Sequence, residues 1–134
     1  MPRDYQLKKN NPWYIDNTNI RRETRCIVED YKNLLSRRID LQRGKRRLSG
    51  HEEGVLQIAQ LKIAAIEETV AELQEKYADT CTGELFDAYG AFNDYRVFCY
   101  YRSRPFKDEA PSTRSWQLYR AEFKWLVAQK LCYI

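Results

Sequence analysis

Residues 50–77 read GHEEGVLQIAQLKIAAIEETVAELQEKY, and this stretch decides the fold class. Apolar or small side chains recur along it at alternating intervals of three and four residues, the spacing of one face of an α-helix. The positions on this seam are Leu56, Ala59, Ile63, Ile66, Val70, Leu73 and Tyr77. We therefore predict a long amphipathic helix that packs its seam against another helix.

A second seam lies between Asn17 and Gly44. The polar run Asp16-Asn17-Thr18 supplies capping side chains, so we expect a helix that starts near Asn17 and continues to Gly44. Its seam consists of Ile20, Thr24, Ile27, Tyr31, Leu34 and Leu41. Two such helices joined by a short glycine-containing loop pack most simply as an antiparallel hairpin over residues 17–80. A dimeric coiled coil would also bury both seams, and a hairpin whose residual apolar edge meets a second subunit would make a homodimer.

Charge is divided unevenly along the chain. Residues 1–50 hold 13 Lys and Arg against 6 acids, residues 51–90 hold 2 against 9, and residues 91–134 hold 8 against 4. The three segments therefore carry net charges of +7, −7 and +4. Either the basic first helix lies along the acidic second helix, or the basic segments face a polyanion.

The composition argues against several classes of protein. The cysteines lie far apart in the sequence, without the close pairs of a zinc site, and His51 has no second histidine with which to bind a metal. The four cysteines are Cys26, Cys81, Cys99 and Cys132. We expect no enzymatic activity, no cofactor and no metal site. Because no apolar run is long enough for a bilayer and no secretory signal is apparent, we also expect a cytoplasmic protein without membrane contact.

The C-terminal region contains the candidate site. Residues 82–102 are rich in aromatic side chains and form one helix or two, and residues 103–111 form a turn because they contain two prolines. Ser112 and Thr113 then cap a final helix that extends to Leu131. Its core face is predicted to be Trp116, Tyr119, Phe123, Leu126, Val127 and Leu131.

The opposite face of this final helix is polar and basic. Together with the two cap residues, it gives the candidate DNA contacts Ser112, Thr113, Arg114, Ser115, Gln117, Arg120, Ala121 and Lys124. A helix, a turn and a second helix with basic residues near its start form the layout of a helix-turn-helix, whose second helix enters the major groove. An ordinary amphipathic surface helix would share much of this pattern.

A second basic cluster lies at the tip of the predicted hairpin. It contains Arg43, Lys45, Arg46 and Arg47. As a phosphate clamp it would add affinity for DNA without reading sequence, and the alternative is a solvated loop.

The final stretch is similar to the ending of the RinA-type activators of phage late transcription, relatives of the ArpU-type regulators. The matching pattern is Ser115-Trp116-x-x-Tyr119-Arg120-x-x-Phe123, followed by Val127-Ala128, Leu131 and Ile134. Upstream, Val28-Glu-Asp-Tyr31 resembles the N-terminal segment of that family, and Ile63 to Val70 with Glu75-Lys-Tyr77 resembles its central helix. Two differences are Glu29 in place of the usual arginine and Cys132 in place of the usual glycine.

This resemblance implies an all-α fold in which an N-terminal helical part precedes a head like the DNA-binding region of sigma factors. We expect a flexible arm at 1–16, a long helical hairpin at 17–80 and a helix-turn-helix head at 81–134. The implied role is sequence-specific activation of packaging and structural genes at a phage late promoter in a bacterial cell. Double-stranded DNA and host RNA polymerase would be the partners. The alternatives are a small terminase-type protein that recognises DNA for packaging, and a protein–protein interaction module without DNA binding.

Overall fold

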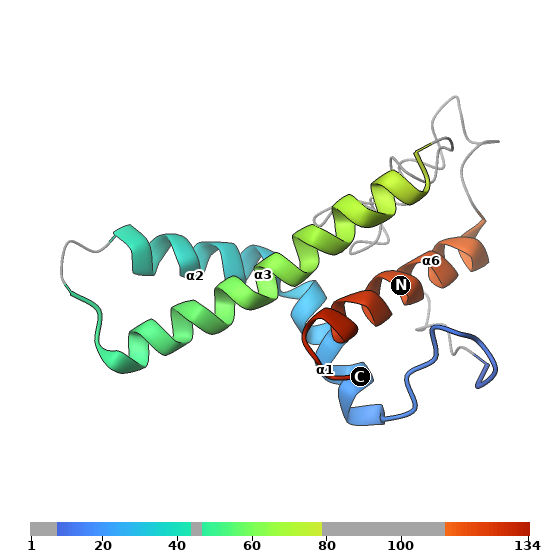
Figure 1. Ribbon diagram of the computed structural model, residues 1–134, viewed down its shortest axis with the longest axis horizontal. Helices are drawn as coiled ribbons and strands as arrows, with labels where there is room; N and C mark the ends of the chain where they lie inside the picture. Colours follow the sequence, from blue (N-terminus) through green and yellow to red (C-terminus); the bar gives the residue numbers. More distant parts are fainter. Residues whose placement is uncertain (1–7, 44–46, 79–111) are drawn as a thin grey trace.

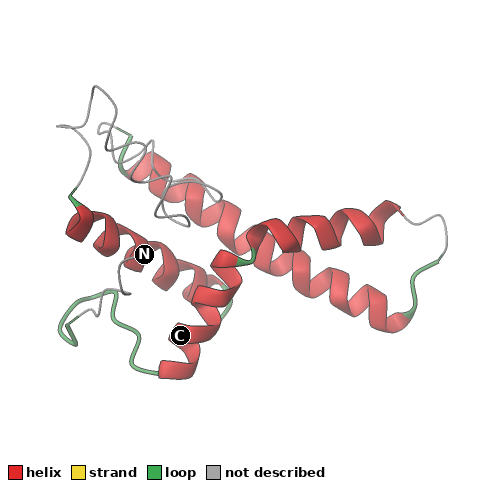
Figure 2. Ribbon diagram, turned by 180° about the vertical axis from the view of Figure 1, so that it is seen from behind, coloured by secondary structure: helices red, strands yellow, loops and turns green. Residues whose placement is uncertain are grey.

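The structure is a computed structural model that describes residues 8–43, 47–78 and 112–134. In these ranges all regular secondary structure is α-helical, as the sequence predicts. The helices are α1 (Thr18–Glu29), α2 (Tyr31–Arg43), α3 (Gly50–Lys76) and α6 (Thr113–Lys130). α2 and α3 lie antiparallel, while α6 runs beside the C-terminal half of α3 and also contacts α1 (Figures 1 and 2). The aromatic segment 82–102 and the turn 103–111 lie outside the described residues.

α3 begins with a complete capping box. The Ser49 hydroxyl accepts a hydrogen bond from the Glu52 backbone N–H, and the Glu52 carboxylate accepts one from the Ser49 N–H. Each bond satisfies a donor that a helix start would otherwise leave unpaired. Glu52 and Glu53 in the first turn and Lys76 in the last turn complement the helix dipole. The helix boundaries are thus set by local chemistry.

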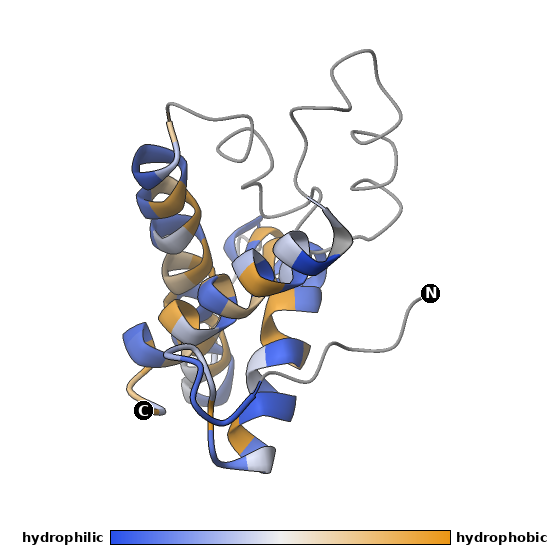
Figure 3. Ribbon diagram, turned by 90° about the vertical axis from the view of Figure 1, so that its right-hand side faces the viewer, coloured by the Kyte–Doolittle hydropathy of each residue, from blue (hydrophilic) through white to orange (hydrophobic). Residues whose placement is uncertain are grey.

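The seam predicted on α3 forms the centre of the core. Ala59, Ile63, Ile66 and Leu73 are buried, and Val70 and Tyr77 pack against them. From α2, Tyr31 and Leu34 join the same cluster, and the Tyr31 hydroxyl donates to Glu67 of α3 at 3.0 Å. Each Ile or Leu side chain of this cluster stabilises the fold by roughly 1.5–3 kcal/mol when it is fully buried. The alternation of hydrophobic and hydrophilic positions is visible along the helices in Figure 3.

α3 also buries a second stripe that the sequence analysis did not predict. Ala65 and Thr69 are buried, and the Thr69 hydroxyl donates to the Ala65 carbonyl at 2.7 Å. Glu72 and Lys76 continue the same stripe and bond side chains of α6. This stripe therefore faces α6, so α3 is covered on two sides.

The first predicted helix is divided in two at Asp30. Its start is as predicted, because the Asn17 side chain accepts from the N–H groups of Asn19 and Ile20. However, Asp30 has φ −90° and ψ 8°, its N–H donates to the carbonyls of Cys26 and Ile27, and α1 and α2 run in different directions on either side of it (Figure 1). The Asn33 amide donates to the Asp30 carboxylate at 2.7 Å. Local side-chain hydrogen bonds of this kind favour a non-helical conformation at Asp. The apolar seam nevertheless continues past Asp30, and for this reason the sequence pattern predicted a single helix.

The described part of the N-terminal arm, residues 8–16, is packed onto the helices. Trp13 meets Trp125 of α6 edge to face at a centroid distance of 5.4 Å, and the Lys76 ammonium lies 5.5 Å from the Trp13 ring. Ile15 is buried. Aromatic pairs of this geometry add about 0.5–1.5 kcal/mol beyond the buried area. The arm thereby covers one side of α6.

Candidate nucleic-acid interface

The first turn of α6 presents polar groups at the molecular surface. Ser112 caps the helix, its hydroxyl oxygen accepting from the Ser115 N–H at 3.2 Å. Arg114 is exposed and makes no hydrogen bond or ion pair within the described ranges, and Gln117 is half-buried one turn along. Of Thr113 only its place in the helix is described. Free helix amides and an unpaired arginine are suited to a phosphate or a base edge.

Further along α6, two of the predicted DNA contacts are turned toward the protein. Ala121 is 7% exposed and belongs to the buried residues. The Arg120 guanidinium donates to the Glu29 carboxylate of α1 at 2.9 Å and lies 5.8 Å from the Trp116 ring, so only 12% of its side chain is exposed. The outward face predicted for the whole helix is therefore wrong at these positions, because Arg120 pairs with α1 and Ala121 is buried. Lys124 is half-buried and has interactions within the molecule.

A buried charged cluster ties α6 to the end of α3. Glu122 is 2% exposed, and its carboxylate accepts hydrogen bonds from the Lys76 ammonium and from the Tyr77 hydroxyl, the latter at 2.7 Å. Burial raises the pKa of the Tyr77 hydroxyl, and the bond to Glu122 raises it further. The sequence analysis did not include Glu122 in the core face. The available signal was that Tyr119 and Leu126, three residues before it and four residues after it, pack against the core.

A second ion pair joins the other end of α6 to α3. The Lys130 ammonium contacts the Glu72 carboxylate at 2.6 Å. The pair is largely exposed on the Glu72 side, so its stabilisation lies in the range of about 0.2–1 kcal/mol. Together with the Arg120–Glu29 pair, it shows that basic residues of α6 neutralise acids of the scaffold. Charge on this helix is therefore poor support for DNA binding beyond the first turn.

The tip that joins α2 to α3 is basic and unpaired where it is described. Arg43 ends α2 and Arg47 precedes the Ser49 cap, and both are exposed. Neither arginine has a hydrogen-bond or ion-pair partner in the described part of the chain. Lys45 and Arg46 lie between them in the sequence and outside the described residues. Arg43 and Arg47 thus place positive charge at the protruding end of the α2–α3 pair (Figure 1).

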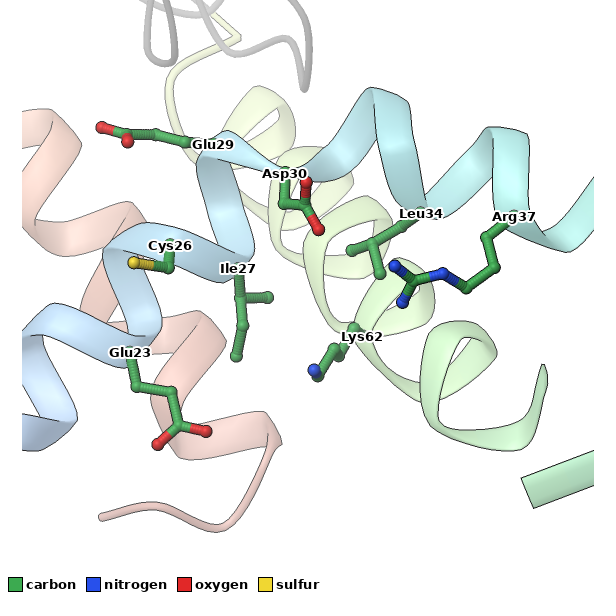
Figure 4. Close-up of a pocket in the computed structure, with 8 residues that line it drawn as sticks. All are labelled: Glu23, Cys26, Ile27, Glu29, Asp30, Leu34, Arg37 and Lys62. Carbon is green, nitrogen blue, oxygen red and sulfur yellow. The ribbon is translucent and has the colours of Figure 1, made fainter. Parts of the chain in front are cut away.

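A pocket of about 430 Å³ lies where α1, α2 and α3 meet (Figure 4). Its apolar floor is Ile27 and Leu34, and its remaining lining is Glu23, Cys26, Glu29, Asp30, Arg37 and Lys62. Arg37 reaches across Leu34, while the Lys62 ammonium points toward α1. Three acids, Glu23, Glu29 and Asp30, line the α1 side of the pocket, and the cations Arg37 and Lys62 line the opposite side (Figure 4). The pocket therefore does not have the uniformly positive charge that a polyanion would need. Within the described residues, no group of His, Cys, Asp and Glu could hold a metal ion.

The two basic sites lie at opposite ends of the molecule (Figure 1). α3 separates them, and its 27 residues correspond to a length of about 40 Å at 1.5 Å per residue. The tip is at the N-terminal end of α3, and the first turn of α6 is near its C-terminal end. The candidate DNA contacts at the tip and on α6 therefore do not form a single surface patch.

Comparisons of the chain with protein-family models, with curated proteins and with solved structures give no match. Among the described helices, none has both the length and the apolar character required to cross a membrane.

Proposed function

We propose that this protein binds double-stranded DNA and activates transcription from a phage late promoter. The observation that carries the DNA-binding part is the tip, where Arg43 and Arg47 are exposed and have no partner in the described part of the chain. Arginine is well suited to phosphate because its planar guanidinium donates two parallel hydrogen bonds. Other basic side chains of the protein, such as Arg120 and Lys130, are already paired with carboxylates.

In this proposal the tip holds the DNA backbone. Its arginines neutralise phosphates and release counterions, which gives affinity on any sequence and a strong dependence on salt. Lys45 and Arg46 add to the same positive charge by their place in the sequence. Glu52 and Glu53 in the first turn of α3 reduce the positive charge near the tip, while the other acids of α3, such as Glu68 and Glu75, lie in its C-terminal half.

Sequence recognition is assigned to the first turn of α6, as the second helix of a helix-turn-helix head. Arg114 is exposed and Gln117 is half-buried, and both side-chain types read base edges in the major groove. Ser112 and Ser115 lie at the amino end of the helix, where the positive end of the helix dipole favours a phosphate. Arg120 and Ala121 are not proposed as DNA contacts, because Arg120 is paired with Glu29 and Ala121 is buried.

The activator role rests on the resemblance of residues 115–134 to the RinA-type activators. A protein that only packages DNA would share the phosphate contacts. It would not stimulate transcription by purified RNA polymerase from a late promoter, so transcription in vitro separates the two roles. A protein–protein interaction module would form no DNA complex at moderate salt.

The decisive experiment measures DNA affinity against salt concentration for wild type and for the double variant Arg43→Ala/Arg47→Ala. Fluorescence anisotropy of a labelled late-promoter duplex gives the dissociation constant at each salt concentration. Because each phosphate contact contributes about 0.9 to the slope of log affinity against log salt, the double variant should lower the magnitude of that slope by nearly two. An unchanged slope would refute the assignment of the tip.

A matched control removes the same charge elsewhere. Arg22 is an exposed cation of α1 that the proposal does not assign to DNA, so Arg22→Ala should leave the slope unchanged. Arg114→Ala should weaken binding to the late-promoter duplex by about 1–3 kcal/mol, with a smaller effect on a duplex of unrelated sequence. If Arg114→Ala weakens binding equally on every sequence, Arg114 contacts a phosphate and not a base.

A further inference from the structure

α3 carries an apolar stripe that is covered over only half of its length. Ala65 and Thr69 of the stripe are buried on the side that faces α6. The same stripe continues toward the start of α3 through Leu61, Ile58 and Gly54, at the four- and three-residue spacing of a helix–helix seam. There it is uncovered, since Ile58 is 54% exposed and Leu61 is 66% exposed. Both are among the most exposed large hydrophobic side chains of the described residues.

The uncovered stretch carries no charge. Residues 54–61 read GVLQIAQL, within a chain in which 31% of the residues are charged. A partner that binds through ion pairs would find no counter-charge on this stretch. A second copy of the chain needs none, because a two-fold contact places identical surfaces together and an uncharged surface brings no like charges into opposition.

We infer that two copies of this protein associate by crossing their α3 helices over residues 54–61. A two-fold axis between Ile58 and Leu61 would bring Ile58 of each copy onto Leu61 of the other. Gly54 presents no side chain, and a Cβ placed on it would meet nothing within 4 Å, so another helix can approach closely there. Because α6 already covers the stripe from Ala65 onward, the helices cross over a short contact and the dimer is weak.

The test is the mass of the protein in solution without DNA, so its result does not depend on the proposed function. Sedimentation equilibrium would span protein concentrations from about 10 µM to about 1 mM, the range of dissociation constants of weak dimers. The weight-average mass of wild type should rise above the monomer mass of 16.1 kDa as the concentration increases. Leu61→Glu should weaken the association by at least about tenfold, because it places two carboxylates at the centre of the contact.

Ile39→Glu provides the matched control. Ile39 is 44% exposed and belongs to α2, not to the stripe of α3, so the same substitution should leave the association unchanged. Leu61→Gln removes the apolar contact without adding charge and should also weaken the dimer, and circular dichroism of each variant checks that it is folded. A wild-type mass of 16.1 kDa at every concentration would overturn the inference. So would equal effects of Ile39→Glu and Leu61→Glu.

Discussion

Replacement of Glu122 by Ala should destabilise the fold by about 3 kcal/mol. The carboxylate is buried and accepts two hydrogen bonds, one from Lys76 and one from Tyr77. Hydrogen bonds to a charged group contribute about 1.5–3 kcal/mol each, and the Lys76 side chain is 50% exposed, so its bond counts near the lower end. The variant also leaves the Tyr77 hydroxyl without its partner.

Urea unfolding followed by far-ultraviolet circular dichroism measures this loss. Glu75→Ala is the control, because Glu75 is an exposed acid on the same α3 helix and its removal should change stability by less than about 0.5 kcal/mol. Glu122→Gln keeps the shape of the side chain and should lie between the two. A loss below about 1 kcal/mol for Glu122→Ala would refute the view that this cluster fixes α6 onto α3.

Three further outcomes follow from the contacts of single side chains. Cys132 has φ 62°, a left-handed conformation that costs a non-glycine residue about 1–2 kcal/mol, so Cys132→Gly should raise the thermal midpoint through a net gain of roughly 0.5–1 kcal/mol. The raised pKa of Tyr77 means that the folded protein keeps a proton that the unfolded chain loses above about pH 10, so stability falls as the pH rises beyond that value. Tyr77→Phe should make that fall shallower in urea titrations at several alkaline pH values. Arg120→Ala should lower the free energy of unfolding by about 0.5–1 kcal/mol through loss of the Glu29 pair, and should leave the salt dependence of DNA binding as in wild type.

The helices and the core were largely predictable from the sequence. The α3 seam positions Ala59, Ile63, Ile66 and Leu73 and the core positions Trp116, Phe123 and Val127 on α6 are buried as the spacing predicts. The helix starts at Asn17 and Ser112 were also predicted, because their capping side chains precede apolar periodic runs. The cap at Ser49 was not predicted. Local spacing and local hydrogen bonding were enough for these features.

The arrangement of the helices was not predictable in the same way. The seam runs unbroken past Asp30, so periodicity carried no sign that the chain turns there. The pairing of Arg120 depends on Glu29 of α1, which is distant in sequence. The burial of Ala121 was also not predictable, because a helix viewed alone shows which face is apolar but not how many neighbours surround it. The tip arginines could be nominated from the sequence because their exposure follows from their place between two helices.

The backbone at Cys132, where α6 ends, adopts a left-handed conformation. The Cys132 N–H donates to the Gln129 carbonyl and the Tyr133 N–H to the Ala128 carbonyl, which together close the last turn of α6. Glycine favours this left-handed conformation because it has no side chain. A cysteine there gives up some stability and leaves an exposed thiol.

The position of α6 against both α1 and α3 has a consequence for synthesis of the protein. Ribosomes add about 5–20 residues per second, so α1 and α3 emerge well before the helix that covers them. During that interval the stripe of α3 that faces α6, with Ala65 and Thr69, lacks its final cover. The nascent chain is therefore expected to bind chaperones that recognise exposed apolar segments until α6 has left the ribosome.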